Sequence, residues 1–145
     1  MSDHALSACV LFLLKDEKGR FALLKRSSHA KWGAGKYSIP GGHVEAGESF
    51  TDTVVREAFE ELGVTIDKEN LRFLHSFYRN TGDQEKVILV FECTQWSGIP
   101  CNNEPEKHTE LMWCSDADVP SPMVPHHSNV LRLITSGISY SEQND

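Results

Sequence analysis

Residues Gly42–Val64 read GHVEAGESFTDTVVREAFEELGV, and this stretch constrains the architecture of the chain more than any other. Its first part is polar and rich in glycine, whereas apolar residues recur at three- and four-residue spacings from Ser49 to Leu62. That spacing places one apolar stripe on an α-helix, so we predict a helix over residues 49–62. Gly63 follows where a residue in the left-handed conformation commonly ends a helix.

Three glutamates of this predicted helix, Glu57, Glu60 and Glu61, lie at positions i, i+3 and i+4. At about 100° per residue, Glu60 lies near −60° and Glu61 near +40° from Glu57, so the three carboxylates share one face. Like charges at this spacing destabilise a helix by a few tenths of a kcal/mol per pair. Oxygen ligands of this kind are what Mg²⁺ and Mn²⁺ prefer. The pattern indicates either a metal site or an ordinary solvated acidic face.

Apolar runs on both sides of the helix predict strands, which favours a mixed sheet between helices. Upstream, residues 8–14 and 21–24 are expected to form a hairpin, and residues 37–40 a short strand that ends in a Pro-Gly-Gly turn. Downstream, the expected strands are residues 71–78, 86–96 and 111–114. A second helix is expected to begin at Ser128 as its N-cap, and residues 139–145 to form a flexible tail.

Composition narrows the class of protein. The 145 residues carry 14 Lys+Arg against 21 Asp+Glu, a net charge of −7, which argues against duplex nucleic acid as a partner. The length fits one domain, predicted over residues 1–138, and no apolar run reaches the roughly 20 residues that span a bilayer. We therefore expect no membrane partner. The four cysteines form no C-x-x-C pair, so we expect reduced thiols and a cytoplasmic location.

The stretch Gly42–Val64 resembles the Nudix box, G-x5-E-x7-R-E-U-x-E-E-x-G-U, in which U is apolar. Every fixed letter of this motif is matched, at Gly42, Glu48, Arg56, Glu57, Glu60, Glu61 and Gly63. The resemblance implies the α/β/α sandwich of the Nudix family, with a mixed central sheet and the acidic helix on one side. It also implies hydrolysis of a nucleoside diphosphate linked to another moiety.

The same resemblance implies a role for each motif residue. Glu57, Glu60 and Glu61 would hold one or more Mg²⁺ ions, for which Mn²⁺ can substitute, together with the Gly42 carbonyl. Arg56 would orient these carboxylates by salt bridges and so belongs to the catalytic set. Two further motif residues, Glu48 and Gly63, would be structural.

Shorter matches resemble the small nucleoside triphosphate pyrophosphatases of the MutT type, which release a nucleoside monophosphate and pyrophosphate. They are residues 33–35, residues 39–45, and residues 104–107 with Trp113 six residues further on. The implied partner is a small-molecule nucleotide, and a homodimer is a further expectation from the resemblance. Nucleotide-sugars or dinucleotide polyphosphates are alternative substrates, and a non-catalytic nucleotide-binding module is an alternative function.

Candidate residues for substrate contact lie outside the helix. Lys25 and Arg26 are predicted to bind the phosphate chain, and Ile39, Gly41 and Trp113 to line the substrate pocket. Aromatic residues are candidates for base stacking or, alternatively, for core packing: Trp32, Phe77, Tyr78 and Trp113. Glu104 or Glu106 is a candidate for one further metal ligand, with a solvated loop charge as the alternative. His126 and His127 are candidates for the far side of the pocket.

Overall fold

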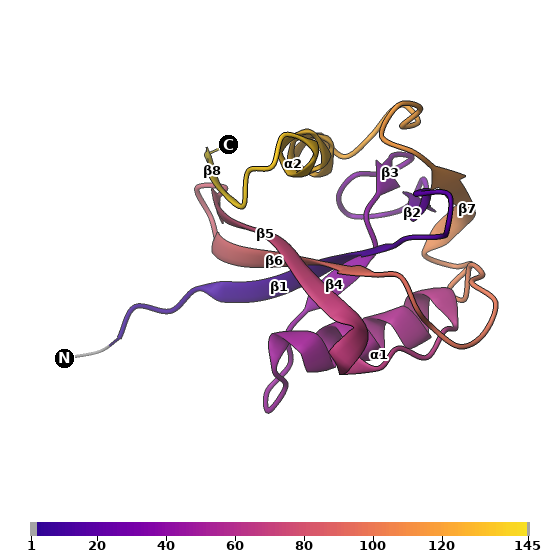
Figure 1. Ribbon diagram of the computed structural model, residues 1–145. Helices are drawn as coiled ribbons and strands as arrows, with labels where there is room; N and C mark the ends of the chain where they lie inside the picture. The colour runs from indigo at the N-terminus through magenta and orange to yellow at the C-terminus, as the bar shows by residue number, and fades with distance from the viewer. Residues whose placement is uncertain (1–2, 145) are drawn as a thin grey trace.

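The computed structural model describes residues 3–144 of the chain. Figure 1 shows the order and arrangement of its elements. They are β1 (Ser7–Leu14), β2 (Phe21–Arg26), β3 (Tyr37–Ser38), β4 (Gly41–His43), α1 (Phe50–Leu62), the 3₁₀ turn η1 (Lys68–Asn70), β5 (Leu71–Asn80), β6 (Glu85–Cys93), β7 (His108–Cys114), α2 (Pro125–Thr135) and β8 (Tyr140–Asn144). No helix within the described residues is both long enough and apolar enough to span a bilayer.

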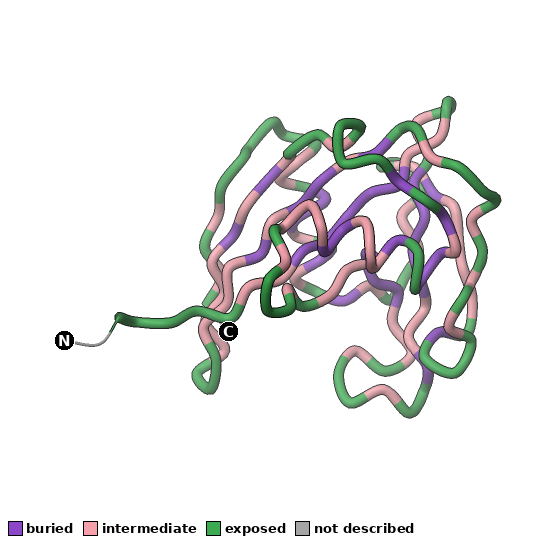
Figure 2. Tube along the Cα trace, turned by 90° about the horizontal axis from the view of Figure 1, so that it is seen from below, coloured by how far each residue is buried: buried purple, intermediate pink, exposed green. Residues whose placement is uncertain are grey.

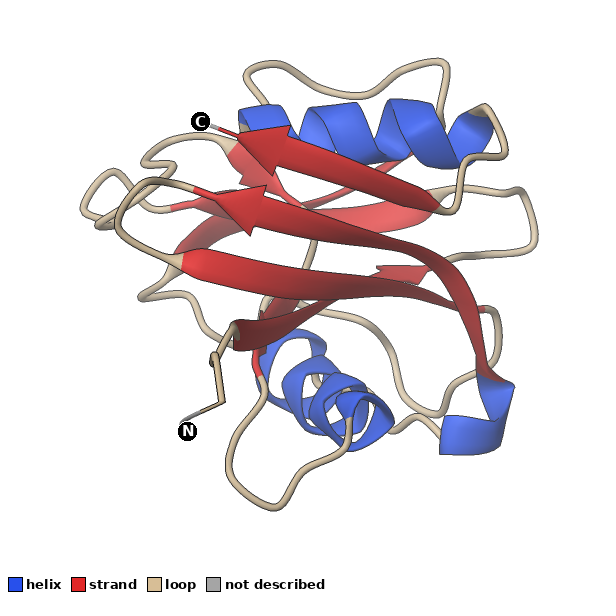
Figure 3. Ribbon diagram, turned by 90° about the vertical axis from the view of Figure 1, so that its left-hand side faces the viewer, coloured by secondary structure: helices blue, strands red, loops and turns tan. Residues whose placement is uncertain are grey.

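The strands form two sheets. One has five strands in the order β4-β1-β6-β5-β8, and the other has three in the order β3-β2-β7. The larger sheet is mixed, because β1 pairs in parallel with β6, and β5 with β8, whereas its other pairs are antiparallel. Figure 3 shows the strands lying between α1 and α2. The predicted α/β/α sandwich, with a mixed sheet and the acidic helix on one side, is confirmed.

From Val10 to Leu14, β1 is apolar and is buried on both of its faces. Successive side chains of a strand point to opposite faces. Val10, Phe12 and Leu14 accordingly belong to the hydrophobic cluster under α1, while Leu11 and Leu13 belong to the cluster under α2. Figure 2 shows that buried segments of the chain run through the centre of the fold. A continuous apolar run is thus the expected pattern for a strand covered by a helix on each side.

Helix α1 has the bounds that its sequence predicts, and both ends are capped. The Asp52 backbone N–H donates to Ser49 Oγ (3.1 Å), and the Ser49 N–H donates to Asp52 Oδ2 (2.9 Å), which makes a reciprocal capping box. At the other end, Gly63 adopts φ 70°, a conformation that other residues adopt only at a cost. Local sequence therefore determines where the helix that carries the acidic face begins and ends.

Two predictions about elements flanking α1 are wrong. Strands β1 and β2 do not form a hairpin but lie in different sheets. Between them, Lys15 and Phe21 form an isolated β-bridge, and the Asp16 N–H donates to the Arg20 carbonyl at 2.8 Å. Helix α2 begins at Pro125 and not near Ser128, and its N-cap Val124 makes no side-chain hydrogen bond. Proline suits the first turn of a helix because its φ is already helical and its missing N–H is not needed there.

The C-terminal residues 139–145, predicted to be a flexible tail, instead contribute the strand β8. Its residues pair in parallel with β5 in the register Ser76 to Tyr140 through Asn80 to Asn144. The ring of His75 in β5 is fully buried. Its nitrogens lie 2.7 Å from the Ile138 carbonyl oxygen and 2.9 Å from Ser141 Oγ, and these hydrogen bonds hold the C-terminal segment against β5. Asp145 lies outside the described residues.

Candidate metal and substrate site

Strand β4 brings two glycines against the acidic face of α1. The Gly41 N–H donates to Glu61 Oε1 at 3.1 Å. A Cβ atom on Gly42 would lie 2.4 Å from Glu57 Oε1, and one on Gly41 would lie 2.0 Å from the Val10 carbonyl oxygen. The turn predicted at these glycines is absent, because Gly41 and Gly42 belong to a strand. The lack of a side chain at Gly42 lets β4 approach the Glu57 carboxylate, and the lack of one at Gly41 lets β4 lie against the backbone of β1.

Arg56 joins the loop before α1 to the helix itself. Its Nε donates to Glu48 Oε2 at 2.6 Å, and its Nη2 donates to the His43 carbonyl at 3.0 Å. On the helix, Nη1 donates to Glu57 Oε1 at 2.8 Å and to Glu60 Oε2 at 3.2 Å. One guanidinium thus fixes the orientation of Glu57 and the path of the loop, as the salt-bridge role predicted for Arg56 requires.

The Arg56–Glu48 pair predicts a pH dependence of stability. The hydrogen bond from Arg56 lowers the pKa of Glu48 from 4.5 to about 2. A carboxyl group with a lowered pKa stabilises the fold above its unfolded pKa, and this contribution is lost as the pH falls through the folded one. Glu48→Gln should therefore lower the urea midpoint at pH 7, and the difference from the parent should shrink between pH 4.5 and pH 2.

Glu69→Gln is the matched control, because Glu69 lies on η1 away from Arg56. It should leave the urea midpoint close to that of the parent at every pH. Equal midpoints for Glu48→Gln and the parent at pH 7 would contradict the structural role of Glu48.

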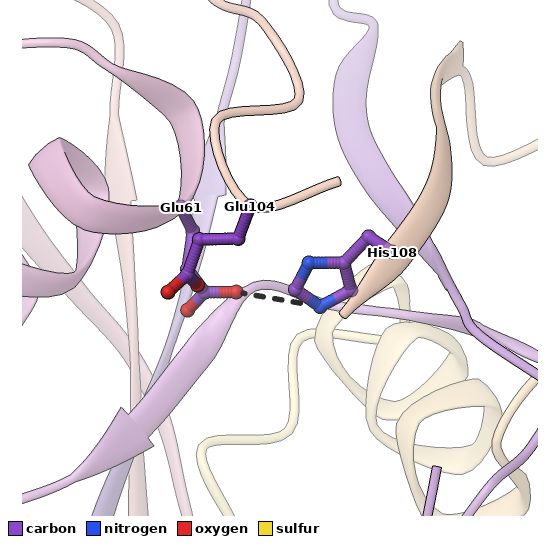
Figure 4. A group of neighbouring side chains, drawn as sticks. All are labelled: Glu61, Glu104 and His108. Atoms are coloured by element: carbon purple, nitrogen blue, oxygen red, sulfur yellow. Dashed lines mark ion pairs between the residues drawn. The ribbon is translucent and has the colours of Figure 1, made fainter. Parts of the chain in front are cut away.

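Three potential metal ligands converge beside α1. Glu61 comes from the last turn of α1, Glu104 from the loop before β7, and His108 is the first residue of β7. One ligand atom of each lies within 4.8 Å of the others (Figure 4). Glu61 and His108 are buried, whereas Glu104 is partly exposed.

Burial controls the charge of this cluster. The pKa of Glu61 is raised well above 4.5, first by burial and then by Glu57 and Glu104. The pKa of His108 is lowered to about 4, first by burial and then by Arg26. His108 is therefore neutral at pH 7, and its 3.9 Å approach to Glu61 Oε2 is not a charged pair at that pH.

The donor set fits a divalent cation. Several carboxylates share a small volume in which ionisation of Glu61 is disfavoured, and a bound cation removes that penalty. Glu57 and Glu61 face the cleft, together with Glu104. Glu60 does not line it: its side chain is 46% exposed and is held by Arg56. The residues present would hold Mg²⁺ or Mn²⁺ through Glu57, Glu61 and Glu104.

The cluster opens into a cleft of about 740 Å³ whose walls carry both signs of charge. Its acidic residues are Glu45, Glu57, Glu61, Glu104 and Glu106, and its basic residues are Arg26, Lys31, Arg79, Lys86 and Lys107. The candidate residues Arg26, Ile39, Gly41 and Gly42 line this cleft. A cation held by the acids and the basic side chains could together bind a chain of phosphates.

Other candidates lie elsewhere. Lys25 does not line the cleft, and its Nζ lies 5.5 Å from the centre of the Tyr37 ring. Trp113 also lies outside the lining and stacks on Trp96 with a centroid separation of 6.4 Å. Tyr78, a stacking candidate, donates instead to Glu85 Oε2 at 2.6 Å.

Aromatic rings line one part of the cleft. Trp32 is 49% exposed there, and the Arg26 guanidinium lies 3.6 Å from the centre of its ring. Arg26 Nε also donates to the Trp32 carbonyl at 2.8 Å, which fixes the loop. The rings of His126 and His127 lie 6.3 and 6.2 Å from Trp32, and Phe77 lies 6.5 Å from His126. Four of these five residues, Trp32, Phe77, His126 and His127, are predicted pocket residues, and the fifth, Arg26, is a predicted phosphate ligand.

The sequence did not predict one buried histidine of the site, His108, or one contact made by another, His127. His108 was not a candidate, although it lies four residues after Glu104 and its N–H donates to the Glu104 carbonyl at 3.0 Å. Residues four positions apart lie close together when the chain makes one helical turn, so the spacing of His108 from Glu104 could have indicated that His108 belongs to the site. His127 accepts from the Ile39 N–H through Nδ1 at 3.0 Å, which links α2 to the segment before Gly41, and no local pattern indicates this contact.

Comparison with known proteins identifies the family. Residues 4–134 match the family model of the NUDIX domain. "Uncharacterized Nudix hydrolase YvcI" of Bacillus subtilis is 30% identical over 107 residues, which are 71% of this chain and 66% of that protein. "Nudix hydrolase 3" of Caenorhabditis elegans is 35% identical over 90 residues, 61% of this chain and 38% of that protein. The chain thus spans less than two thirds of the length of both relatives.

A solved structure is also similar. The MutT NUDIX hydrolase from Burkholderia pseudomallei superposes with a TM-score of 0.78 at 27% identity, covering 89% of this chain and 98% of that one. The "8-oxo-dGTP diphosphatase" of Escherichia coli is 25% identical over 123 residues, 83% of this chain and 93% of that protein. This chain belongs to the Nudix family. Within this family, the chain is similar to MutT-type members.

Proposed function

We propose that this chain is a divalent-cation-dependent pyrophosphohydrolase that cleaves a nucleoside triphosphate into a nucleoside monophosphate and pyrophosphate. The observation that carries the proposal is the cleft that the α1 carboxylates Glu57 and Glu61, of which Glu61 is buried, line together with basic side chains of β2, β5 and β6. Such a site can hold a cation and a polyanion together, although the whole chain is acidic. Similarity to MutT proteins supports a triphosphate as substrate.

Each group of residues has a part in the reaction. Glu57, Glu61 and Glu104 would hold Mg²⁺ or Mn²⁺, which when bound withdraws charge from phosphate oxygens and activates water. Arg26 and Lys107 bind the phosphate chain by charge-assisted hydrogen bonds. A carboxylate of the cleft accepts the proton of the attacking water, the phosphoanhydride bond breaks, and pyrophosphate leaves. The backbone N–H of Gly41 holds Glu61 in place throughout.

A substrate panel tests the proposal. The chain is incubated with Mg²⁺ and canonical, oxidised or methylated dNTPs, nucleotide-sugars or dinucleotide polyphosphates, and the products are separated by ion-exchange chromatography. We expect monophosphate and pyrophosphate from triphosphates, and no product when EDTA is present. Turnover of nucleotide-sugars or dinucleotide polyphosphates alone would overturn the triphosphate assignment. Tight binding of a nucleotide with no turnover of any substrate would support a non-catalytic module instead.

Trp32 is expected to bind the base of the substrate. Stacking of a base on an aromatic side chain is worth about 1–3 kcal/mol, so Trp32→Ala should raise KM for a nucleoside triphosphate about 10-fold with a smaller change in kcat. Inorganic tripolyphosphate has no base, and its KM should not change. Phe59→Ala, at an exposed aromatic outside the cleft lining, is the control. An equal rise in KM for both substrates would show that Trp32 acts on the phosphates instead.

The cysteines bear on the compartment. Cys9, Cys93, Cys101 and Cys114 all lie in the described part of the chain, and none of them forms a disulfide. Free thiols are typical of reducing compartments. We therefore extend the proposal to a cytoplasmic pool of nucleotides.

A further inference from the structure

We propose that His108 is itself a metal ligand, supplying an imidazole nitrogen to the cation held by Glu61 and Glu104. The inference rests on the proposed function only in taking this cluster as the cation site. A nitrogen ligand changes the chemistry of the site, because imidazole suits first-row transition metals, whereas Mg²⁺ prefers oxygen. Because affinity for a given ligand set rises from Mn²⁺ to Co²⁺ along the first-row series, the site should bind Co²⁺ more tightly than a site made of carboxylates alone.

The spacing of the ligand atoms supports one shared ion. His108 Nε2 lies 3.9 Å from Glu61 Oε2, which is beyond the roughly 3.2 Å limit of a hydrogen bond between nitrogen and oxygen. Ligands at about 2.1 Å from one octahedral ion lie about 3.0 Å apart when adjacent and about 4.2 Å apart when opposite. The observed separation falls between these values, and Glu104 completes the group within 4.8 Å.

The burial of His108 is the second, independent observation. The residue is only 4% exposed, and within the described residues its Nδ1 has no hydrogen-bond partner. Buried polar atoms nearly always have a partner, so an imidazole whose Nδ1 has none and whose Nε2 lies 3.9 Å from Glu61 Oε2, beyond hydrogen-bond reach, calls for an explanation. Figure 4 shows that the ring edge carrying both nitrogens faces the two carboxylates. A polar, buried edge directed at two carboxylates is what a cation site requires.

The backbone holds His108 and Glu104 as one unit. The His108 N–H donates to the Glu104 carbonyl at 3.0 Å, and the Asn102 side chain donates to the His108 carbonyl at 2.7 Å. His108 is also paired with Arg26 in the register of β7 and β2. Ligands fixed in this way lose little conformational freedom when the ion binds.

Pulsed electron paramagnetic resonance of the full chain loaded with Mn²⁺ tests the proposal directly. Nitrogen bonded to Mn²⁺ gives a ¹⁴N modulation that carboxylate ligands do not give. We expect this modulation in the parent and in His29→Gln, which alters an exposed histidine of the same cleft, and its loss in His108→Gln. A parent spectrum without ¹⁴N modulation, or an unchanged one in His108→Gln, would overturn the proposal.

Metal affinity gives a second readout that separates ligation from a structural role. By calorimetry, His108→Gln should weaken Co²⁺ binding at least 10-fold and Mg²⁺ binding less than 3-fold. Equal losses for both ions would mean that His108 only supports the fold, and the proposal would fail. If the variant does not fold, the parent spectrum alone decides. Loss of all turnover in the substrate panel, with the ¹⁴N modulation present, would refute the proposed function and leave this inference standing.

Discussion

Glu61→Gln is expected to lower kcat by about 100- to 1,000-fold while the fold stays intact. Glu61 is a buried carboxylate of the cleft, held by the Gly41 N–H and close to Glu104 and His108. Removing its charge weakens cation binding and with it the stabilisation of charge on the phosphates, and single groups of this kind are worth about 100- to 1,000-fold. Steady-state turnover of a triphosphate with saturating Mg²⁺ measures the effect.

The same variant should gain stability when no metal is present. Because the pKa of Glu61 is raised in the fold, its ionisation destabilises the native state increasingly as the pH rises above 4.5. Glutamine cannot ionise and so removes this destabilisation. Metal-free Glu61→Gln should therefore melt at a higher temperature than the parent at pH 8, with a smaller difference at pH 4.5. Glu69→Gln should change neither activity nor melting. Full activity in Glu61→Gln would refute its role in metal binding.

Gly42→Ala is expected to lower kcat about 100-fold without changing any charge. The new Cβ would lie 2.4 Å from Glu57 Oε1 and 2.5 Å from its Cδ, so the carboxylate must move away from its position beside Arg56. A displacement of about 1 Å in a catalytic site costs on the order of 100-fold in rate. Turnover and Mn²⁺ affinity measured on the same sample should both decrease.

Gly19→Ala is the matched control for Gly42→Ala. Gly19 has φ 78°, and a Cβ there meets no atom within 4 Å. Alanine in this left-handed conformation should cost about 1–2 kcal/mol of stability with no loss of activity. Unchanged turnover in Gly42→Ala would mean that the close approach of β4 to Glu57 does not matter for function.

Local sequence accounts for α1 and its acidic face. The apolar period, the Ser49 cap and Gly63 act within a few residues of one another, so the helix and its three glutamates follow from short-range rules. Whether each glutamate enters the cleft does not follow, because that depends on β4. The structure turns Glu57 and Glu61 toward the cleft and leaves Glu60 on Arg56.

The alternation of side chains along a strand explains why Lys25, a predicted phosphate ligand, does not line the cleft. Lys25 and Arg26 are neighbours at the end of β2, and neighbouring side chains in a strand face opposite ways. Only one of the two can face the cleft, and it is Arg26. The parallel pairing of β8 and the contact of His127 with Ile39 join residues more than 60 positions apart. Such long-range pairings leave no periodic trace in either segment.

The position of β8 has a consequence for how the molecule behaves at high concentration. Without β8, the ten residues of β5 would be an edge strand of the sheet, and Phe73 on this strand is 48% exposed. The unpaired N–H and C=O groups of an edge strand of this length can pair with strands of other chains, which leads to aggregation. The short, polar sequence Tyr140–Asn144 covers part of that border with side chains that are poor templates for self-association.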